Sequence, residues 1–463
     1  MAQPDNVLDY MDESFFLDFQ AQGHGAMIQF VWIYDRDVDL AALRRFHHNL
    51  GNSLLSRCVE ASPLPGGRSR WVAWSPPDDF DIAEKSRPRA ELAAWTDEQA
   101  ALPIALEGGP PWRLAVQPFV EGGAAVSLLV SHAVGDGVGI NNAVADAVLG
   151  TGALPGYPPP HSRTRIWALL DDALQLIRDL PGVARALLAS PRAAKEVPMR
   201  VRAGLEKSPV RRGETPGLPA RRGPGTELVR TGMPRLPSLT VLIDTRHWDE
   251  CAERLGGTSN SLLIGVTSKL CAILGWVDSD GLANIAIPVN ERQPGDTRGN
   301  ALTSAAMTVD PAAATDLRGI RAGVKAALTK LTAARDTIMA PLALIPFVPK
   351  FVANRFQTVL QKSANITCSH FGDLDPAVNR PDGSDADWFY ARHARTPDMA
   401  DPALLRRAGG MFFPVASGRL GGRIYTSICY SDGAGSTTVE DLSAAARRAL
   451  DEFGVTSVAA VIA

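Results

Sequence analysis

A histidine, an aspartate and a glycine stand at fixed offsets directly after an apolar run of the chain. The run covers residues 124–131 between Gly123 and Gly135, and it is followed by His132, Asp136 and Gly137. Eight residues of this character, bounded by glycines, predict a buried strand. An unperturbed imidazole titrates near pH 6.5 and can therefore accept a proton at neutral pH. The stretch indicates a general base at the mouth of a buried strand, with a carboxylate beside it.

The turn after the histidine also has a structural interpretation. A single histidine at a strand end is often a satisfied structural residue. Asp136 is expected to be a buried carboxylate that pairs with an arginine or with backbone amides, and Gly137 lets the chain turn away from the site. Apolar residues at helical spacing then predict a helix over 138–149. Further along the chain, Thr258-Ser259 offers a cap for a helix, and Thr437-x-x-Glu440 predicts a capping box for the last helix.

Length and composition limit the class of protein. A chain of 463 residues is too long for one ordinary core. We expect one domain over 1–190, a second over 236–463, and between them a proline-rich linker over 191–235 with eleven Lys or Arg against four Glu. The net charge of −3 argues against nucleic acid as a partner. Five scattered cysteines without a Cys-x-x-Cys pair, and histidines without ligand spacing, predict reduced thiols and no metal site.

No basic-then-apolar leader follows Met1, and no run of 18 apolar residues predicts a transmembrane helix. Two segments leave contact with a lipid surface open. Residues 338–348 are apolar but broken by Pro341 and Pro346, and they fit either a core-lining loop or a lipid-facing patch. Residues 163–189 predict a long amphipathic helix, interrupted near Pro181, that either closes the first domain or rests on a membrane. The expected location is the cytoplasm, or the surface of a membrane or lipid droplet.

The pattern His132-x-x-x-Asp136-Gly137 resembles the signature of acyltransferases that use coenzyme A or a carrier protein. The order of weaker motifs along the chain is similar to that of the bacterial wax ester synthase/diacylglycerol acyltransferase family. These motifs are Leu8-Asp9 with Phe15-Phe16, Pro110-Pro111-Trp112, Thr258-Ser259-Asn260, Ile287-Pro288-Val289-Asn290, Gly299-Asn300 and Ser369-His370-Phe371-Gly372.

The resemblance implies an α/β fold of two chloramphenicol-acetyltransferase-like domains, each a mixed sheet packed with helices, with the site in a tunnel between them. It implies that His132 is the general base, that acyl-CoA is a co-substrate, and that no cofactor is bound. The acceptor would be the hydroxyl of a fatty alcohol or of diacylglycerol, giving a wax ester or triacylglycerol. Asn260 and Ser369, at family motif positions, are candidates to contact the substrate or the oxyanion. The family usually has a second histidine where this chain has Ser131.

The sequence leaves two alternative functions open. A related transferase would acylate a polyketide, a sugar or an amine, with the acyl group carried by a carrier protein. A non-catalytic member of the fold would only bind acyl-CoA. A serine hydrolase is disfavoured, because Ser131 and His132 are neighbours in a strand and point to opposite faces, and because the chain has no Gly-x-Ser-x-Gly elbow.

Overall fold

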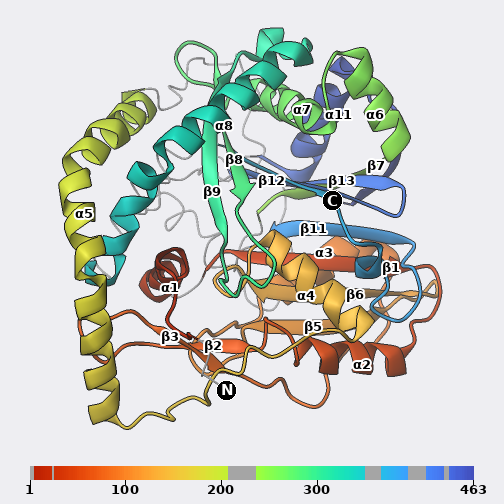
Figure 1. Ribbon diagram of the computed structural model, residues 1–463. Coiled ribbons are helices and arrows are strands. Elements are labelled where there is room, and N and C mark those ends of the chain that lie inside the picture. Colours follow the sequence, from red (N-terminus) through yellow and green to blue (C-terminus); the bar gives the residue numbers. More distant parts are fainter. Residues whose placement is uncertain are drawn as a thin grey trace, which may run out of the picture.

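The chain folds into two lobes, each built from one sheet and the helices that cover it (Figure 1). The computed structural model describes residues 5–22, 25–206, 236–349, 366–394, 413–431 and 437–462, without the side chains of 22 and 189–206. The predicted α/β architecture of two sheet-and-helix lobes is confirmed.

The first sheet has the strand order β11-β1-β6-β5-β4. Its strands are β1 (Met27–Tyr34), β4 (Asp81–Ile82), β5 (Trp112–Pro118), β6 (Ala124–Ser131) and β11 (Trp388–Ala394). The central strand β6 is antiparallel to both neighbours, β1 and β5, and all eight of its residues are buried. The apolar run 124–131 therefore forms the buried strand that its composition predicts, and β6 ends where His132 begins.

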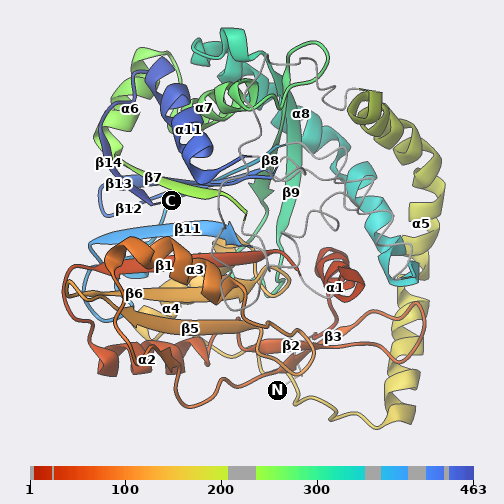
Figure 2. The same cartoon turned by 180° about the vertical axis from the view of Figure 1, so that it is seen from behind.

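Helices cover both faces of this sheet. They are α2 (Leu40–Leu50) and α4 (Gly137–Leu149), which pack on each other, and α3 (Leu92–Ala100), which follows the short 3₁₀ turn η1 (Arg89–Glu91) and contacts β6 and β1. α2 and α4 lie on one face and α3 on the other, as the two opposite views show (Figures 1 and 2). A two-stranded ribbon, β2 (Arg57–Glu60) with β3 (Arg70–Ala73), and helix α1 (Tyr10–Gln22) complete this side of the molecule.

The second sheet has seven strands in the order β14-β7-β13-β12-β10-β8-β9. They are β7 (Ser238–Asp244), β8 (Ala283–Asn290), β9 (Leu302–Val309), β10 (Ile366–Asp373), β12 (Pro414–Leu420), β13 (Arg423–Cys429) and β14 (Val458–Ile462). Its helices are α6 (Thr245–Arg254), α7 (Ser259–Ile273), α8 (Leu317–Met339) and α11 (Val439–Glu452), and the 3₁₀ segment η2 (Pro311–Ala313) packs on α7. The 3₁₀ segment η3 (Ala340–Phe347) packs on α8 and α1, and η4 (Pro376–Asn379) packs on α4 of the first lobe. This lobe reaches the candidate site through the β8–β9 connection, residues 291–301, and through Phe371 of β10.

One strand from the second half of the sequence belongs to the first sheet. β11 pairs antiparallel with β1, from Met27 opposite Ala394 to Ile33 opposite Trp388. Phe389 of β11 packs edge-on against Tyr425 of β13, with ring centroids 5.7 Å apart. The exchange of this strand, visible between the two sheets in Figure 1, ties the lobes together through the backbone.

The long helix α5 (Arg165–Glu206) differs from the sequence prediction in two ways. It passes through Pro181 without a break. Pro181 is exposed, so the carbonyl that it leaves without an intrahelical donor is open to water. The helix also takes in residues 191–206 of the predicted linker, and residues 207–235 lie outside the described part of the chain. Among the described residues, no helix has the length and apolar content needed to cross a bilayer.

The cap of the last helix was predicted one residue too early. The sequence suggested a capping box between Thr437 and Glu440, but α11 is capped by Thr438, whose side chain accepts from the amide of Asp441. Asp441 returns the bond to Thr438, so the box is shifted by one position. Two Thr-x-x-acid pairs overlap here, Thr437 with Glu440 and Thr438 with Asp441, and the structure uses the second. The cap predicted at Thr258 for α7 is confirmed.

Candidate active site

His132 lies where the two lobes meet, immediately after β6. Its backbone amide donates to the carbonyl of Ala26 at 2.9 Å, which extends the β1–β6 pairing by one residue. The imidazole is half-buried. The ring of Phe15, from α1, lies parallel to it at a centroid distance of 4.8 Å. These contacts hold the ring in one place while leaving part of it accessible.

The tautomer of His132 is set by Asn300 from the β8–β9 connection. The amide nitrogen of Asn300 donates to the carbonyl oxygen of His132 at 2.9 Å and lies 3.2 Å from a carboxylate oxygen of Asp12. Both of these groups are acceptors, so the amide oxygen must be the atom that faces Nδ1 of His132, at 2.9 Å. Nδ1 therefore carries the proton in the neutral ring, and Nε2 carries the lone pair of a base.

Asp12 holds Asn300 in that orientation. Its carboxylate accepts from the backbone amides of Gly299 and Asn300, at 2.9 and 2.7 Å, as well as from the Asn300 side chain. Asp12 is fully buried, and burial raises its pKa to about 6, while the charge of Arg57 acts in the opposite direction. The series Asp12–Asn300–His132 thus links α1 of the first lobe, the β8–β9 connection of the second, and the candidate base.

Asp136 fixes the turn that follows His132. One of its oxygens accepts from the amide of Gly139 at 2.7 Å and caps α4. The other accepts from Arg292 at 2.8 Å and from the amide of Ala301 at 2.8 Å. The Asp136 and Arg292 side chains are only 5% and 6% exposed. This buried ion pair joins the two lobes within four residues of the histidine.

A second buried arginine supports the same turn. One guanidinium nitrogen of Arg57 donates to the carbonyl of Val134 at 2.8 Å, and another donates to the carbonyl of Thr297. The guanidinium also stacks over the ring of Trp71, with 4.1 Å between its central carbon and the ring centroid. Arg57 therefore bridges the 133–136 turn and the β8–β9 connection.

Gly137 is required by a close contact rather than by an unusual backbone angle. A Cβ atom at this position would overlap the ring of Phe371, which belongs to β10 of the second lobe. The absence of a side chain lets the start of α4 lie against that strand. The glycine at the end of the motif is thus explained by the approach of the two lobes.

The environment keeps His132 neutral near pH 7. Burial lowers the pKa of the imidazole, because the charged form loses hydration. The negative charge of Asp136 and the hydrogen bond to Asn300 raise the pKa and offset part of this effect. The dominant lowering favours the unprotonated state that a general base needs.

The remaining predicted site residues lie elsewhere in the fold. Ser131 is completely buried, and its hydroxyl accepts from the amide of Ala133 at 3.3 Å, which fits its position on the other side of the strand from His132. Asn260 is half-buried in the first turn of α7. Ser369 is buried in β10, opposite Ala416 of β12. Among the described residues, no hydrogen bond or ring contact joins Asn260 or Ser369 to His132, and their roles stay predictions.

Three residues that support the histidine were not assigned a role from sequence. Asp12, Arg292 and Asn300 each lie far along the chain from His132, and Asn300 is 168 residues away from it. The sequence contained a weak signal for each of them, because each lies in or beside one of the weaker motifs. Asp12 falls in the opening motif, Arg292 follows the 287–290 motif, and Asn300 is the second residue of the Gly299-Asn300 motif. Sequence order alone did not say which of these residues would meet.

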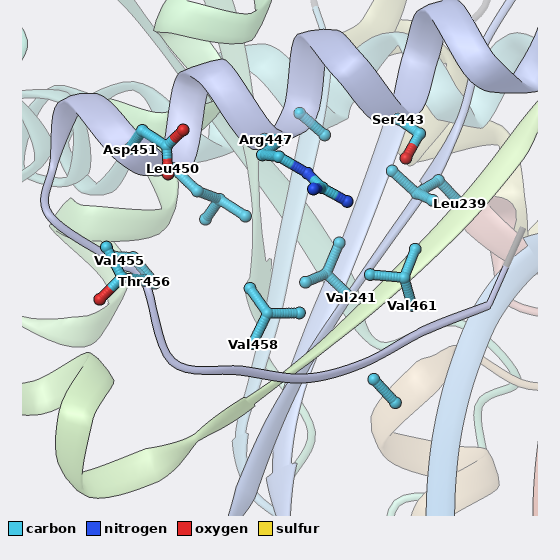
Figure 3. Close-up of a pocket in the computed structure, with 12 residues that line it drawn as sticks. Leu239, Val241, Ser443, Arg447, Leu450, Asp451, Val455, Thr456, Val458 and Val461 are labelled. Atoms are coloured by element: carbon cyan, nitrogen blue, oxygen red, sulfur yellow. The ribbon is translucent and has the colours of Figure 1, made fainter.

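The second lobe contains a cavity that shares no lining residue with this cluster. It has a volume of about 390 Å³ and is enclosed by α11 and the strands β7 and β14, with Leu239, Arg447 and Val461 among its lining residues (Figure 3). None of its lining residues is His132, Asp136 or Asn300. In the described part of the chain, no three His, Cys, Asp or Glu side chains are grouped in a way that would hold a metal ion.

Replacing Gly137 by alanine tests the close approach of the lobes. We expect Gly137→Ala to lower the free energy of unfolding by about 1–3 kcal/mol, because the new methyl group overlaps the Phe371 ring. The matched control is Gly319→Ala, at an exposed helical position of α8 with open space around it, which should stabilise by about 0.5–1 kcal/mol. Urea unfolding of both variants measures the difference, and equal effects at the two sites would contradict the packing argument.

Removal of the Asp136 charge tests the buried ion pair. Asp136→Asn keeps the shape of the side chain but leaves Arg292 buried without a counter-charge, which should cost about 3–5 kcal/mol of unfolding free energy. Glu98→Gln removes one charge from the more exposed Arg87–Glu98 pair and should cost about 0–1 kcal/mol. Thermal and urea unfolding provide the comparison. A loss at Asp136 no larger than that at Glu98 would show that the pair is not what joins the lobes.

The fold is shared with several solved structures of low sequence identity. The first condensation domain of the calcium-dependent antibiotic synthetase, in complex with a substrate analogue, matches 98% of this chain and 100% of its own length, with a TM-score of 0.58 and 14% identity. The wax ester synthase/diacylglycerol acyltransferase from Marinobacter aquaeolei VT8 matches over 97% and 100%, with a TM-score of 0.53 and 12% identity.

A third structure of the same kind is polyketide synthase associated protein 5 from Mycobacterium tuberculosis. It matches over 98% of this chain and 99% of its own, with a TM-score of 0.52 and 13% identity. No protein-family profile matches the chain, and no curated protein matches it by sequence. At these identities the comparisons establish the architecture, and this chain has the two-lobed fold of the condensation domains and of the acyltransferases that share it.

Proposed function

We propose that this protein transfers a long-chain acyl group from acyl-CoA to the hydroxyl of a fatty alcohol or a diacylglycerol, giving a wax ester or triacylglycerol. The observation that carries the proposal is the state of His132. Asn300 holds the proton on Nδ1, so Nε2 is the basic nitrogen of a half-buried ring at the junction of the lobes. The motif around His132 and the fold shared with a wax ester synthase/diacylglycerol acyltransferase support the choice of reaction.

The proposed reaction needs only one proton acceptor. Nε2 of His132 takes the proton of the acceptor hydroxyl as its oxygen attacks the thioester carbonyl, which gives a tetrahedral oxyanion and an imidazolium. The oxyanion collapses, the carbon–sulfur bond breaks, and the thiolate takes the proton from Nε2. The products are an ester and free CoA, and the histidine returns to its starting state.

No covalent acyl-enzyme is needed in this scheme. A thioester is already activated, since a thiolate leaves more readily than an alkoxide. The hydroxyl of Ser131 is fully buried and accepts from a backbone amide, so it is not aimed at the histidine. Orientation of two bound substrates and stabilisation of the oxyanion supply the rest of the rate. Asn260 and Ser369 are the side chains that we propose for contacts with the substrate or the oxyanion.

A second candidate is transfer to an amine from an acyl group held on a carrier protein. The condensation-domain structure, which matches over its whole length, favours it. The same base would then take a proton from an attacking ammonium or amine, and an amide would form. The two candidates differ in the acceptor atom and in the donor, and the structure of the base is compatible with both.

A product assay distinguishes these functions. Purified protein is given radiolabelled palmitoyl-CoA with hexadecanol, with diacylglycerol, with a long-chain amine, or with no acceptor, and lipid products and free CoA are followed. Ester formation supports the first proposal, and amide formation the second. Binding of palmitoyl-CoA without turnover in any mixture would instead indicate a non-catalytic binding protein.

Loss of the base should abolish most of the turnover. We expect His132→Gln to lower kcat about 10²–10⁴-fold, because glutamine keeps a polar side chain but cannot accept the proton. The value of kcat/KM for the wild type should rise with pH through an apparent pKa below the ordinary 6.5 and then level off, because burial favours the neutral ring. Initial rates between pH 5 and 8 provide the test. Turnover retained in His132→Gln, or an acidic limb centred above pH 7, would contradict the assignment.

Asn300 is proposed as a positioning residue for His132. We expect Asn300→Ala to lower kcat by about 10²-fold with a much smaller change in KM, since the basic nitrogen is no longer fixed. The hydrogen bond to Asn300 raises the His132 pKa, so its loss should also move the acidic limb of the rate profile to lower pH. The control is Asn284→Ala in β8. It removes the side-chain hydrogen bonds of Asn284 with Asp278, which precedes the strand, and with Thr308 of β9. If the acidic limb of the Asn300→Ala rate profile lies at the same pH as in the wild type, Asn300 has only a structural role.

A further inference from the structure

Helix α5 is built with its polar side toward the protein. Asp172, which is 1% exposed at its side chain, accepts from Arg70 at 3.0 Å and from Arg163 at 2.8 Å. About two turns further on, Asp179 accepts two bonds from Arg68, each of 2.9 Å. These ion pairs attach the helix to the β2–β3 ribbon and its neighbouring loops.

The opposite side of α5 is apolar and open to solvent. Its large side chains are between 51% and 79% exposed: Ile166, Leu170, Leu174, Ile177, Leu180, Leu187 and Leu188. At about 100° per residue they share an arc of roughly 140° that contains no charged residue. From Ile166 to Leu188 this strip is about 33 Å long at a rise of 1.5 Å per residue. We call it the α5 strip. A helix that stabilised the fold only by packing would place this face inward.

One border of the strip carries an aromatic residue and two cations, with a single exposed carboxylate, Asp171, beside them. Trp167, which is 63% exposed, lies near its N-terminal end, and Arg178 and Arg185, both exposed, follow along the same edge. Tryptophan and arginine at the boundary of an apolar surface are typical of helices that lie in the interface of an anionic bilayer. A second copy of the chain would bring the same excess of cations, two arginines against Asp171, and would complement this border less well than an anionic surface.

The position of α5 connects the strip to the candidate site. The helix runs along the outer edge of the molecule past both lobes (Figures 1 and 2). It packs on η3, an apolar segment whose Phe347 is 44% exposed, and η3 packs on α1. α1 carries Phe15, the ring that stacks on His132. A surface that contacts α5 therefore lies on the same side of the protein as the elements leading to the base.

We propose that the α5 strip docks on an anionic phospholipid surface, with its apolar side chains at the level of the acyl chains and Arg178 and Arg185 among the headgroup phosphates. The inference does not depend on the proposed acyl transfer, because it concerns attachment and can be measured without substrate. Docking would bring a lipid phase next to a site for which a lipid acceptor is proposed.

Vesicle co-sedimentation of the full-length protein tests the proposal. Vesicles of phosphatidylcholine alone are compared with vesicles of three parts phosphatidylcholine to one part phosphatidylglycerol, at low and at physiological salt. The wild type should pellet with the mixed vesicles and less with phosphatidylcholine alone. Leu170→Glu/Ile177→Glu should reduce the bound fraction about tenfold or more, and Arg178→Glu/Arg185→Glu should remove the preference for phosphatidylglycerol. Brominated lipids should quench the wild-type fluorescence and quench Trp167→Phe less.

The control variant is Val120→Glu/Leu149→Glu, at two exposed apolar positions outside α5. It should bind vesicles like the wild type, and circular dichroism verifies that each variant is folded. His132→Gln should also bind normally, so failure of catalysis and failure of docking are separated. Wild-type protein that stays in the supernatant with both vesicle types would overturn the proposal. So would a dimer in sedimentation velocity that Leu170→Glu/Ile177→Glu dissociates, since the strip would then be an interface between copies.

Discussion

The structure depends on two buried carboxylates that hold one connection between strands. Asp12 and Asp136 come from the first lobe, and both accept hydrogen bonds from the 291–301 segment of the second. Backbone amides and the guanidinium of Arg292 are the donors. Charged groups are costly to bury unless each is paired and hydrogen-bonded. Here most of the bonds that compensate the burial also join the lobes, whereas the bond from the amide of Gly139 to Asp136 lies within the first lobe. The lobes cannot separate at this point without leaving charges unpaired.

The same connection determines what His132 can do. Asn300 receives its orientation from Asp12 and from the carbonyl of His132, and it then fixes the proton on Nδ1. The chemistry of the imidazole is thus decided by a residue that belongs to the opposite lobe. Separation of the lobes at this point would break both the Asp136–Arg292 ion pair and the hydrogen bond that sets the tautomer of His132.

The region around β6 and the helix α5 place their polar and apolar side chains in opposite ways. Around β6, apolar side chains are inside and polar groups are paired at the lobe junction. On α5 the order is reversed, with Asp172 and Asp179 against the protein and leucines outside. Ion pairs with Arg68, Arg70 and Arg163 supply the attachment that apolar packing would otherwise provide. Exposure of the α5 strip to water costs hydrophobic free energy, and contact with a lipid phase would remove that cost.

Local features were available from the sequence because they depend on neighbours in the chain. The strand 124–131, the helix after Gly137 and the Thr258 cap follow from apolar spacing and cap chemistry over a few residues. Local reasoning also failed in identifiable ways. It broke α5 at Pro181, where the exposed face tolerates a missing bond, and it placed the last cap at Thr437 because two overlapping pairs satisfied the same rule.

The sequence by itself determined that a histidine follows a buried strand and that a carboxylate and a glycine stand beside it. Only the tertiary structure decided which nitrogen of His132 is basic, which arginine neutralises Asp136, and which side of α5 faces water. The physical reason is distance along the chain. Asn300 lies 168 residues from His132 and 288 from Asp12, and periodicity within a strand or helix carries no information about contacts over such separations.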